Sequence, residues 1–283
     1  MSESADLLHA IPPHWREAAH HWLHYGSPLR PCAADVRVME EFVRRCHAQR
    51  RARPFRALLW GVTPEIATMA WPEGTQLLAV DRSPPMIRHV WPGDLAGQRK
   101  AVCGDWFEFD RGAERFDVII GDGVFAILDY PAQYRTLAAL ARGWLASDGV
   151  LVTRSFVQAA VKETPEAVLA DLRANRIDSF HAFKLRLAMA LQESARSGTR
   201  MGDVFSAWAD ARIEIDALAS ATGWPRAAIE TIHLFDGRDT RLSFPSAAQL
   251  DALMSEHFAK LEERRLPYEL GERCPIASFA PRS

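Results

Sequence analysis

The chain has 283 residues and a mass of 31.7 kDa, with 48% hydrophobic and 25% charged residues, which is typical of a globular protein and not of a disordered one. Its 34 lysines and arginines nearly balance its 36 aspartates and glutamates, and a net charge of −2 does not favour nucleic acid or anionic membranes as partners. No apolar run predicts a membrane span, no secretory signal opens the chain, and the four cysteines lie far apart. We therefore expect a cytoplasmic protein without a metal site.

The first 50 residues predict an N-terminal helical segment that is interrupted by the sequence GSPLRP at residues 26–31. Pro28 cannot continue a helix, and Pro31 biases Arg30 toward extended geometry. A second helix is expected over residues 35–48, where five apolar residues keep helical spacing.

Short apolar runs alternate with helix-like pieces between residues 54 and 157. Near-continuous apolar strands separated by helices indicate a parallel sheet that is covered on both faces. The expected strands are residues 55–60, 76–81, 99–104, 116–122 and 150–157, and the expected helices are 64–70, 84–90 and 134–146.

Residues 158–230 are rich in helix signals and show no strand pattern, so we expect a helical insertion that serves as a lid or as a wall of a substrate site. Helices are expected after Thr164, over residues 180–191 and over 203–220. The final stretch predicts a helix over 246–258 and an antiparallel hairpin at the sheet edge, with strands near 260–264 and 275–280.

These elements define an α/β fold class. We expect a Rossmann-like, doubly wound, mostly parallel seven-stranded sheet with an N-terminal helical segment over residues 1–50. The remaining domain covers residues 51–283, and the helical insertion at 158–230 follows its fifth strand.

In a doubly wound sheet, ligands bind beyond the carboxyl ends of the strands, so the residues that follow each strand are the first candidates. Gly61 follows the first strand and lets the backbone approach a ligand closely. Asp81 ends the second strand, 20 residues beyond Gly61, and its two acceptor oxygens suit the hydroxyls of a ribose. The alternative for Asp81 is a helix cap.

Two further pairs of residues follow the third and fourth strands. Asp105 can accept a hydrogen bond from an adenine amino group while Trp106 flanks the ring; the alternative is a turn aspartate beside a core tryptophan. Asp122 and Gly123 lie close to any group transferred at this edge, or form a simple turn.

The order of these strands and of the residues that follow them resembles that in the class I S-adenosylmethionine (SAM) dependent methyltransferases. The resemblance covers residues 54–157 well and 231–283 loosely. In that family the first loop typically has the form GxGxG. Here it reads LWGVTPE, where Gly61 matches the first glycine and Thr63 and Glu65 occupy the positions of the other two.

The resemblance implies SAM as the cofactor, S-adenosylhomocysteine as its product, and in-line transfer of a methyl group to a small molecule. It implies that Tyr25 and Arg30 complete the pocket from the N-terminal segment, with Arg30 pairing the amino-acid carboxylate; the alternative is a solvated Arg30 in a structural turn. The implied cofactor contacts are Tyr25, Arg30, Gly61, Thr63, Asp81, Arg82, Asp105, Trp106, Asp122 and Gly123.

The acceptor and its general base are less well defined by the sequence. Asp122, Tyr130 and His181 are candidate bases, and none has a diagnostic spacing. The stretch GDGVFAI lacks the Asn/Asp-Pro-Pro-Tyr pattern that resembles nucleic-acid base methyltransferases, which favours a small-molecule acceptor. The apolar residues Phe180, Phe183, Met189 and Trp208 are expected in the core more than in a pocket.

Two other functions stay open at this point. One is a protein of the same fold that has lost catalysis and acts as a binding or regulatory partner, which the altered first loop motivates. The other is a nicotinamide-dependent oxidoreductase on a Rossmann-like sheet, although the GxGxxG expected for it is missing. A homodimer is also left open.

Overall fold

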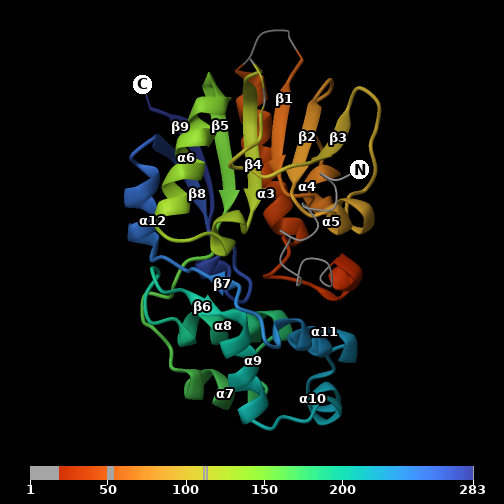
Figure 1. Cartoon of the computed structure of the whole chain (residues 1–283), viewed down its shortest axis with the longest axis vertical. Helices are drawn as coiled ribbons and strands as arrows, with labels where there is room; N and C mark the ends of the chain where they lie inside the picture. The colour runs from red at the N-terminus through yellow and green to blue at the C-terminus, as the bar shows by residue number, and fades with distance from the viewer. Residues whose placement is uncertain (1–18, 50–53, 111, 113, 283) are drawn as a thin grey trace.

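The computed structural model describes residues 19–49, 54–110, 112 and 114–282, so the helical expectation for residues 1–18 lies outside the described part. A seven-stranded sheet with the order β3-β2-β1-β4-β5-β9-β8 forms its centre (Figure 1). The strands are β1 Arg56–Trp60, β2 Gln76–Asp81, β3 Arg99–Cys103, β4 Phe116–Asp122, β5 Leu145–Arg154, β8 Phe258–Arg264 and β9 Ile276–Pro281. Strands β1 to β5 pair in parallel, whereas β9 is antiparallel to β5 and to β8. The predicted fold class and the C-terminal hairpin are confirmed.

The central strands are apolar on both faces because helices cover both sides of the sheet. Leu59 of β1 and Ile120 of β4 belong to a core shared with α3, α4 and α5, whereas Leu58 and Ile119 point into the opposite core, which α6 and α12 cover. The covering helices are α3 Ala33–Ala48, α4 Pro64–Ala67, α5 Pro84–His89, α6 Ala132–Trp144 and α12 Ala247–Met254.

A separate helical unit follows β5, on the side of the sheet where that strand ends (Figure 1). It has its own core, built around Phe180, Phe183 and Trp208. Its helices are α7 Pro165–Arg173, α8 Phe180–Leu191, α9 Met201–Asp210, α10 Ile215–Thr222 and α11 Arg226–Glu230.

The structure corrects the sequence interpretation of this unit in one detail. No strand is expected between residues 158 and 230, yet β6 Thr199–Arg200 pairs antiparallel with β7 Arg241–Leu242. Two residues are too few to produce an alternating pattern, which is why the sequence gives no sign of this ribbon.

The fifth strand also begins earlier than expected. It starts at Leu145, which pairs with Phe116 before a register shift, and the preceding helix therefore ends at Trp144. The remaining short 3-10 helices are η1 Trp22–His24, η2 Val124–Ile127, η3 Thr231–Phe235 and η4 Gly271–Arg273. In the described part of the chain, none of the helices combines the length and the apolar character needed to cross a bilayer.

Candidate functional site

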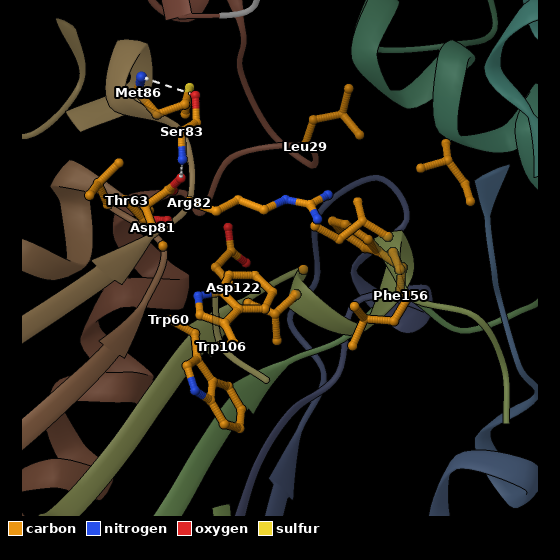
Figure 2. A pocket seen from close by; sticks show the side chains of 18 of the residues that line it. Leu29, Trp60, Thr63, Asp81, Arg82, Ser83, Met86, Trp106, Asp122 and Phe156 are labelled. Atoms are coloured by element: carbon orange, nitrogen blue, oxygen red, sulfur yellow. Dashed lines mark hydrogen bonds between the residues drawn. The ribbon is translucent and has the colours of Figure 1, made fainter. Parts of the chain in front are cut away.

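A cavity of about 350 Å³ lies between the carboxyl ends of β1 to β4 and the helical unit (Figure 2). The loops that follow the four strands form one wall, and residues 22–30 together with the helical unit form the others. All ten residues proposed from the sequence as cofactor contacts line this one cavity: Tyr25, Arg30, Gly61, Thr63, Asp81, Arg82, Asp105, Trp106, Asp122 and Gly123.

Asp81 keeps one carboxylate oxygen available to the cavity. Its Oδ1 accepts the backbone N–H of Ser83 at 2.8 Å, while Oδ2 accepts no hydrogen bond from the described residues. A Cβ atom added at Gly61 would lie 3.8 Å from this Oδ2. Ser83, not Asp81, caps α5, because its hydroxyl accepts the N–H of Met86 (Figure 2). Burial raises the pKa of Asp81 to about 6, although the Ser83 N–H and Arg82 oppose the rise.

Gly61 adopts a backbone conformation that favours glycine. Its φ angle is +86°, and its N–H donates to the carbonyl of Val80 at 2.8 Å, which fixes the turn between β1 and α4 against β2. Residues 61–63 of this turn line the cavity together with Asp81.

Asp105 and Trp106 form the next part of the wall. Oδ1 of Asp105 accepts the N–H of Phe107 at 2.8 Å, and the Trp106 indole donates to the carbonyl of Val80 at 2.8 Å, so both side chains are held in place. Arg82 Nη1 lies 3.9 Å from Asp105 Oδ2, and in Figure 2 the Arg82 side chain extends from the end of β2 toward the middle of the cavity. Asp105 is thus both a turn residue and a cavity residue.

Asp122 is held in a buried ion pair that the sequence interpretation missed. Arg154, at the end of β5 and 0% exposed, donates from Nε to Asp122 Oδ1 at 2.5 Å and from Nη2 to Oδ2 at 3.2 Å. Arg154 Nη1 also lies 3.5 Å from Asp35 Oδ2, and Tyr268 donates to Asp35 Oδ1 at 2.9 Å. Burial raises the pKa of Asp122, although Arg154 opposes the rise. Two carboxylates therefore share one guanidinium beneath the cavity.

Arg30 is largely occupied by groups of the protein. Its Nη1 donates to the carbonyls of Trp22 and Tyr25 at 2.9 and 3.2 Å, its Nε donates to Glu65 Oε1 at 2.8 Å, and its Nη2 forms an ion pair with the same carboxylate. Because a guanidinium has five N–H groups, one Nη2 donor remains. The second oxygen of Glu65 is buried and has no partner among the described residues.

Of the three candidate bases, only Asp122 lines the cavity. His181 Nε2 donates to the carbonyl of His24 at 2.8 Å and its ring stacks on Tyr25, while burial lowers its pKa to about 3 and keeps it neutral. Tyr130 packs edge-on against Tyr134. Neither His181 nor Tyr130 is among the described residues that line the cavity.

The helical unit contributes lining residues that the sequence does not single out. Apolar residues in helices normally indicate a core, and Phe180, Phe183, Met189 and Trp208 are indeed buried there and do not line the cavity. The side chains that do line it from this direction, which we call the apolar wall, are Leu185, Met201, Leu234, Phe235, Leu242 and Phe244.

Comparisons with known proteins rest on structure alone, because no protein-family model and no curated protein matches the sequence. The CcbJ methyltransferase of Streptomyces caelestis is 15% identical, with a TM-score of 0.54 over 94% of this chain and 96% of that one. The 1,6-didemethyltoxoflavin N1-methyltransferase of Burkholderia thailandensis, whose structure holds 1,6-didemethyltoxoflavin and S-adenosylhomocysteine, is 16% identical, with a TM-score of 0.51 over 99% and 89%.

A third similar structure is a Rhodobacter sphaeroides protein provisionally named as a Zn-dependent alcohol dehydrogenase. It is 10% identical, with a TM-score of 0.56 over 94% of this chain and 98% of that one. In the part of the present chain that the structure describes, no three His, Cys, Asp or Glu side chains are grouped as metal ligands would be.

The sheet has the order β3-β2-β1-β4-β5-β9-β8, and β9 runs antiparallel beside β5. This architecture matches two methyltransferases over nearly the whole length of each chain. The chain therefore has the fold of the class I SAM-dependent methyltransferases.

Proposed function

We propose that this protein is a SAM-dependent methyltransferase that acts on a small molecule. The observation that carries the proposal is the unpartnered Oδ2 of Asp81 beside the left-handed turn at Gly61, at the carboxyl edge of the sheet. This is where a doubly wound sheet binds a nucleoside. The methyltransferase of B. thailandensis, with its bound S-adenosylhomocysteine, is of the same fold and supports the choice of cofactor.

The cavity has groups that fit each part of SAM. Oδ2 of Asp81 would accept the ribose hydroxyls, and the remaining lone pairs of Asp105 would accept the adenine amino group while the fixed ring of Trp106 bounds the base. The spare Nη2 donor of Arg30 would bind the amino-acid carboxylate.

The ammonium and the sulfonium of SAM would lie near negatively charged side chains of the protein. Asp35 and Asp122 together outweigh the one positive charge of Arg154, so this buried cluster carries a net charge of −1. The free oxygen of Glu65 adds a second acceptor close to Arg30. Both features would favour an ammonium or a sulfonium over a neutral ligand.

When bound, SAM supplies an activated methyl group: an acceptor lone pair bonds to the methyl carbon as the carbon–sulfur bond breaks in line and its electrons stay on sulfur. The chain's own contribution is to hold the two reactants in contact and to exclude water, which can account for much of a rate enhancement. Asp122 lines the cavity, but its ion pair with Arg154 makes it an electrostatic group more than a free base. An acceptor proton, where there is one, would pass to water.

We propose that the helical insertion over residues 158–230 closes the acceptor side of the site. Leu185 of α8 and Met201 of α9 line the cavity opposite the strand ends, and Tyr25 of the N-terminal segment stacks on His181 of α8. Because the helical unit follows β5 in the chain, it can cover the carboxyl ends of the strands without interrupting the sheet.

Calorimetric titrations with SAM, S-adenosylhomocysteine and NADH test the proposal. We expect both sulfur nucleosides to bind and NADH not to bind. Binding of NADH without either sulfur nucleoside would overturn the proposal in favour of an oxidoreductase. Binding of SAM without label transfer from methyl-tritiated SAM to any member of a broad panel of small acceptors would favour a protein of this fold that has lost catalysis.

A further inference from the structure

The cavity has two chemically unlike halves. Every charged side chain that lines it in the described part of the chain comes from the strand ends or from the N-terminal segment, namely Arg30, Asp81, Arg82, Asp105 and Asp122. The apolar wall on the opposite side contributes none. Phe156, after β5, extends this apolar surface toward Gly123 (Figure 2).

The apolar wall is aromatic and firmly held. A Cβ atom at Gly123 would lie 2.9 Å from Phe156 Cε2, so the ring packs directly against the backbone at the end of β4. Phe235 and Phe244 are buried parts of the core of the helical unit, where movement would open voids. Three phenyl rings at fixed positions favour a flat, unsaturated ligand over a flexible chain.

The ionisable groups behind this wall do not offer a charged acceptor a partner. Lys184 of α8 is 1% exposed, and its Nζ donates to Thr231 Oγ1 at 2.7 Å. The ammonium lies 4.6 Å from the ring centroid of Tyr25 and 5.2 Å from that of Phe235, and both of these residues line the cavity whereas Lys184 does not. His181, neutral and also packed on Tyr25, lies on the same side. The guanidinium of Arg154 lies 5.3 Å from the ring centroid of Phe156 and is already paired with Asp122.

Charge therefore discriminates between acceptors in this half. A cationic acceptor would lose its hydration next to alkyl and phenyl groups and would meet the like charge of Lys184. An anionic acceptor would lose its hydration too, and the rings of Tyr25 and Phe235 would keep it from the ammonium. A neutral acceptor has neither cost, because it replaces water on an apolar surface.

From this division of the cavity we infer that the methyl acceptor is a neutral, largely apolar small molecule that contains an aromatic ring. The inference rests on the proposed function, since it takes the strand-end half of the cavity to be filled by the cofactor. It implies an acceptor atom that is nucleophilic without a charged partner from the apolar wall, such as a ring nitrogen or a phenolic oxygen.

The test uses three ligands that share the naphthalene ring system and differ in charge. S-Adenosylhomocysteine is titrated first, and the saturated protein is then titrated at pH 7 with 2-naphthol, 2-naphthoate and 2-naphthylmethylammonium. We expect the neutral naphthol to bind at least tenfold more tightly than either ion. Equal or tighter binding of an ion would overturn the inference. A failure of the first titration would instead contradict the proposed function, so the two failures are distinguishable.

Variants of the apolar wall test the same inference by changing the protein instead of the ligand. Leu185→Glu should raise the affinity for the naphthyl ammonium at least tenfold while leaving the affinity for S-adenosylhomocysteine within twofold. Leu261→Glu, on the exposed face of β8, is the matched control and should change neither affinity. If Leu185→Glu does not fold, Leu242→Glu at the partly exposed edge of the same wall replaces it. No change in charge preference for a folded wall variant would refute the assignment of this wall to the acceptor.

Discussion

Replacing Lys184 with methionine should stabilise the protein at neutral pH, because the native ammonium is buried without a carboxylate to pair with it. The side chain is 1% exposed, and no ion pair of Lys184 occurs among the described residues. Burial lowers its pKa from 10.5 to about 7. Thr231 loses no essential partner in the variant, because its own hydroxyl donates to the Ala228 carbonyl at 2.6 Å.

The magnitude follows from the difference in proton affinity between the folded and unfolded chains. At roughly 1.4 kcal/mol for each tenfold change, a pKa lowered to about 7 destabilises the folded state by about 4 kcal/mol at pH 7 and about 2 kcal/mol at pH 9. The unfolded chain binds more protons between pH 7 and 10.5, so native stability rises with pH across that window. Lys184→Met removes this cost, so we expect a gain of about 4 kcal/mol at pH 7 and about 2 kcal/mol at pH 9. The contacts of the ammonium with Tyr25 and Phe235 reduce the gain only where Lys184 is charged.

Urea unfolding of the wild type and of Lys184→Met at pH 7 and pH 9 measures both quantities. We expect the gain to shrink markedly at pH 9, and we expect the exposed control Lys162→Met to stay within about 0.5 kcal/mol of the wild type at both pH values. A variant that is less stable than the wild type at pH 7 would refute the reasoning and would mean that the aromatic rings more than compensate the ammonium.

Three further predictions concern the cofactor edge. Affinity for S-adenosylhomocysteine should fall up to tenfold for each pH unit below about 6, because protonation removes an acceptor from Asp81. Calorimetry measures this affinity, and a value that does not change from pH 7 to pH 5 would contradict the role of Asp81 as a ligand-binding carboxylate. Gly61→Ala should lower the melting temperature through about 1–2 kcal/mol of strain at φ +86° and weaken binding of the same ligand. Gly143→Ala, near the C-terminal end of α6 where a Cβ atom would meet no heavy atom within 4 Å, should do neither, and equal behaviour of the two variants would exclude a special role for the turn. Arg154→Met should cost about 3–5 kcal/mol in urea unfolding by leaving two buried carboxylates unpaired, and a loss under 1 kcal/mol would show that they are not held as ions.

The sheet is predictable from the sequence because each central strand contains an uninterrupted run of apolar residues. The expected bounds of the second and fourth strands, 76–81 and 116–122, agree with β2 and β4. Asp81 and Asp122 could be picked out because each ends such a strand, and the parallel arrangement then brings the ends of different strands to one edge. That the cavity residues bind a cofactor stays a prediction.

The other half of the site depends on tertiary packing that no local pattern encodes. Leu185 lines the cavity whereas Phe183, two residues earlier on α8, is buried in the core, and both are apolar residues of one helix that is buried nearly all round. The Asp122–Arg154 pair joins residues 32 positions apart. An arginine ending the apolar run LVTR did hint at an acidic partner, since an unpaired charge is rarely buried.

Titration of the wild type, Asp81→Ala and Asp210→Ala with S-adenosylhomocysteine tests the central claim most directly. Asp210, exposed at the end of α9 and not among the residues that line the cavity, is the matched control. We predict micromolar binding by the wild type and by Asp210→Ala, and at least tenfold weaker binding by a folded Asp81→Ala. No binding by the wild type, or equal binding by all three proteins, would contradict the assignment of this cavity to SAM.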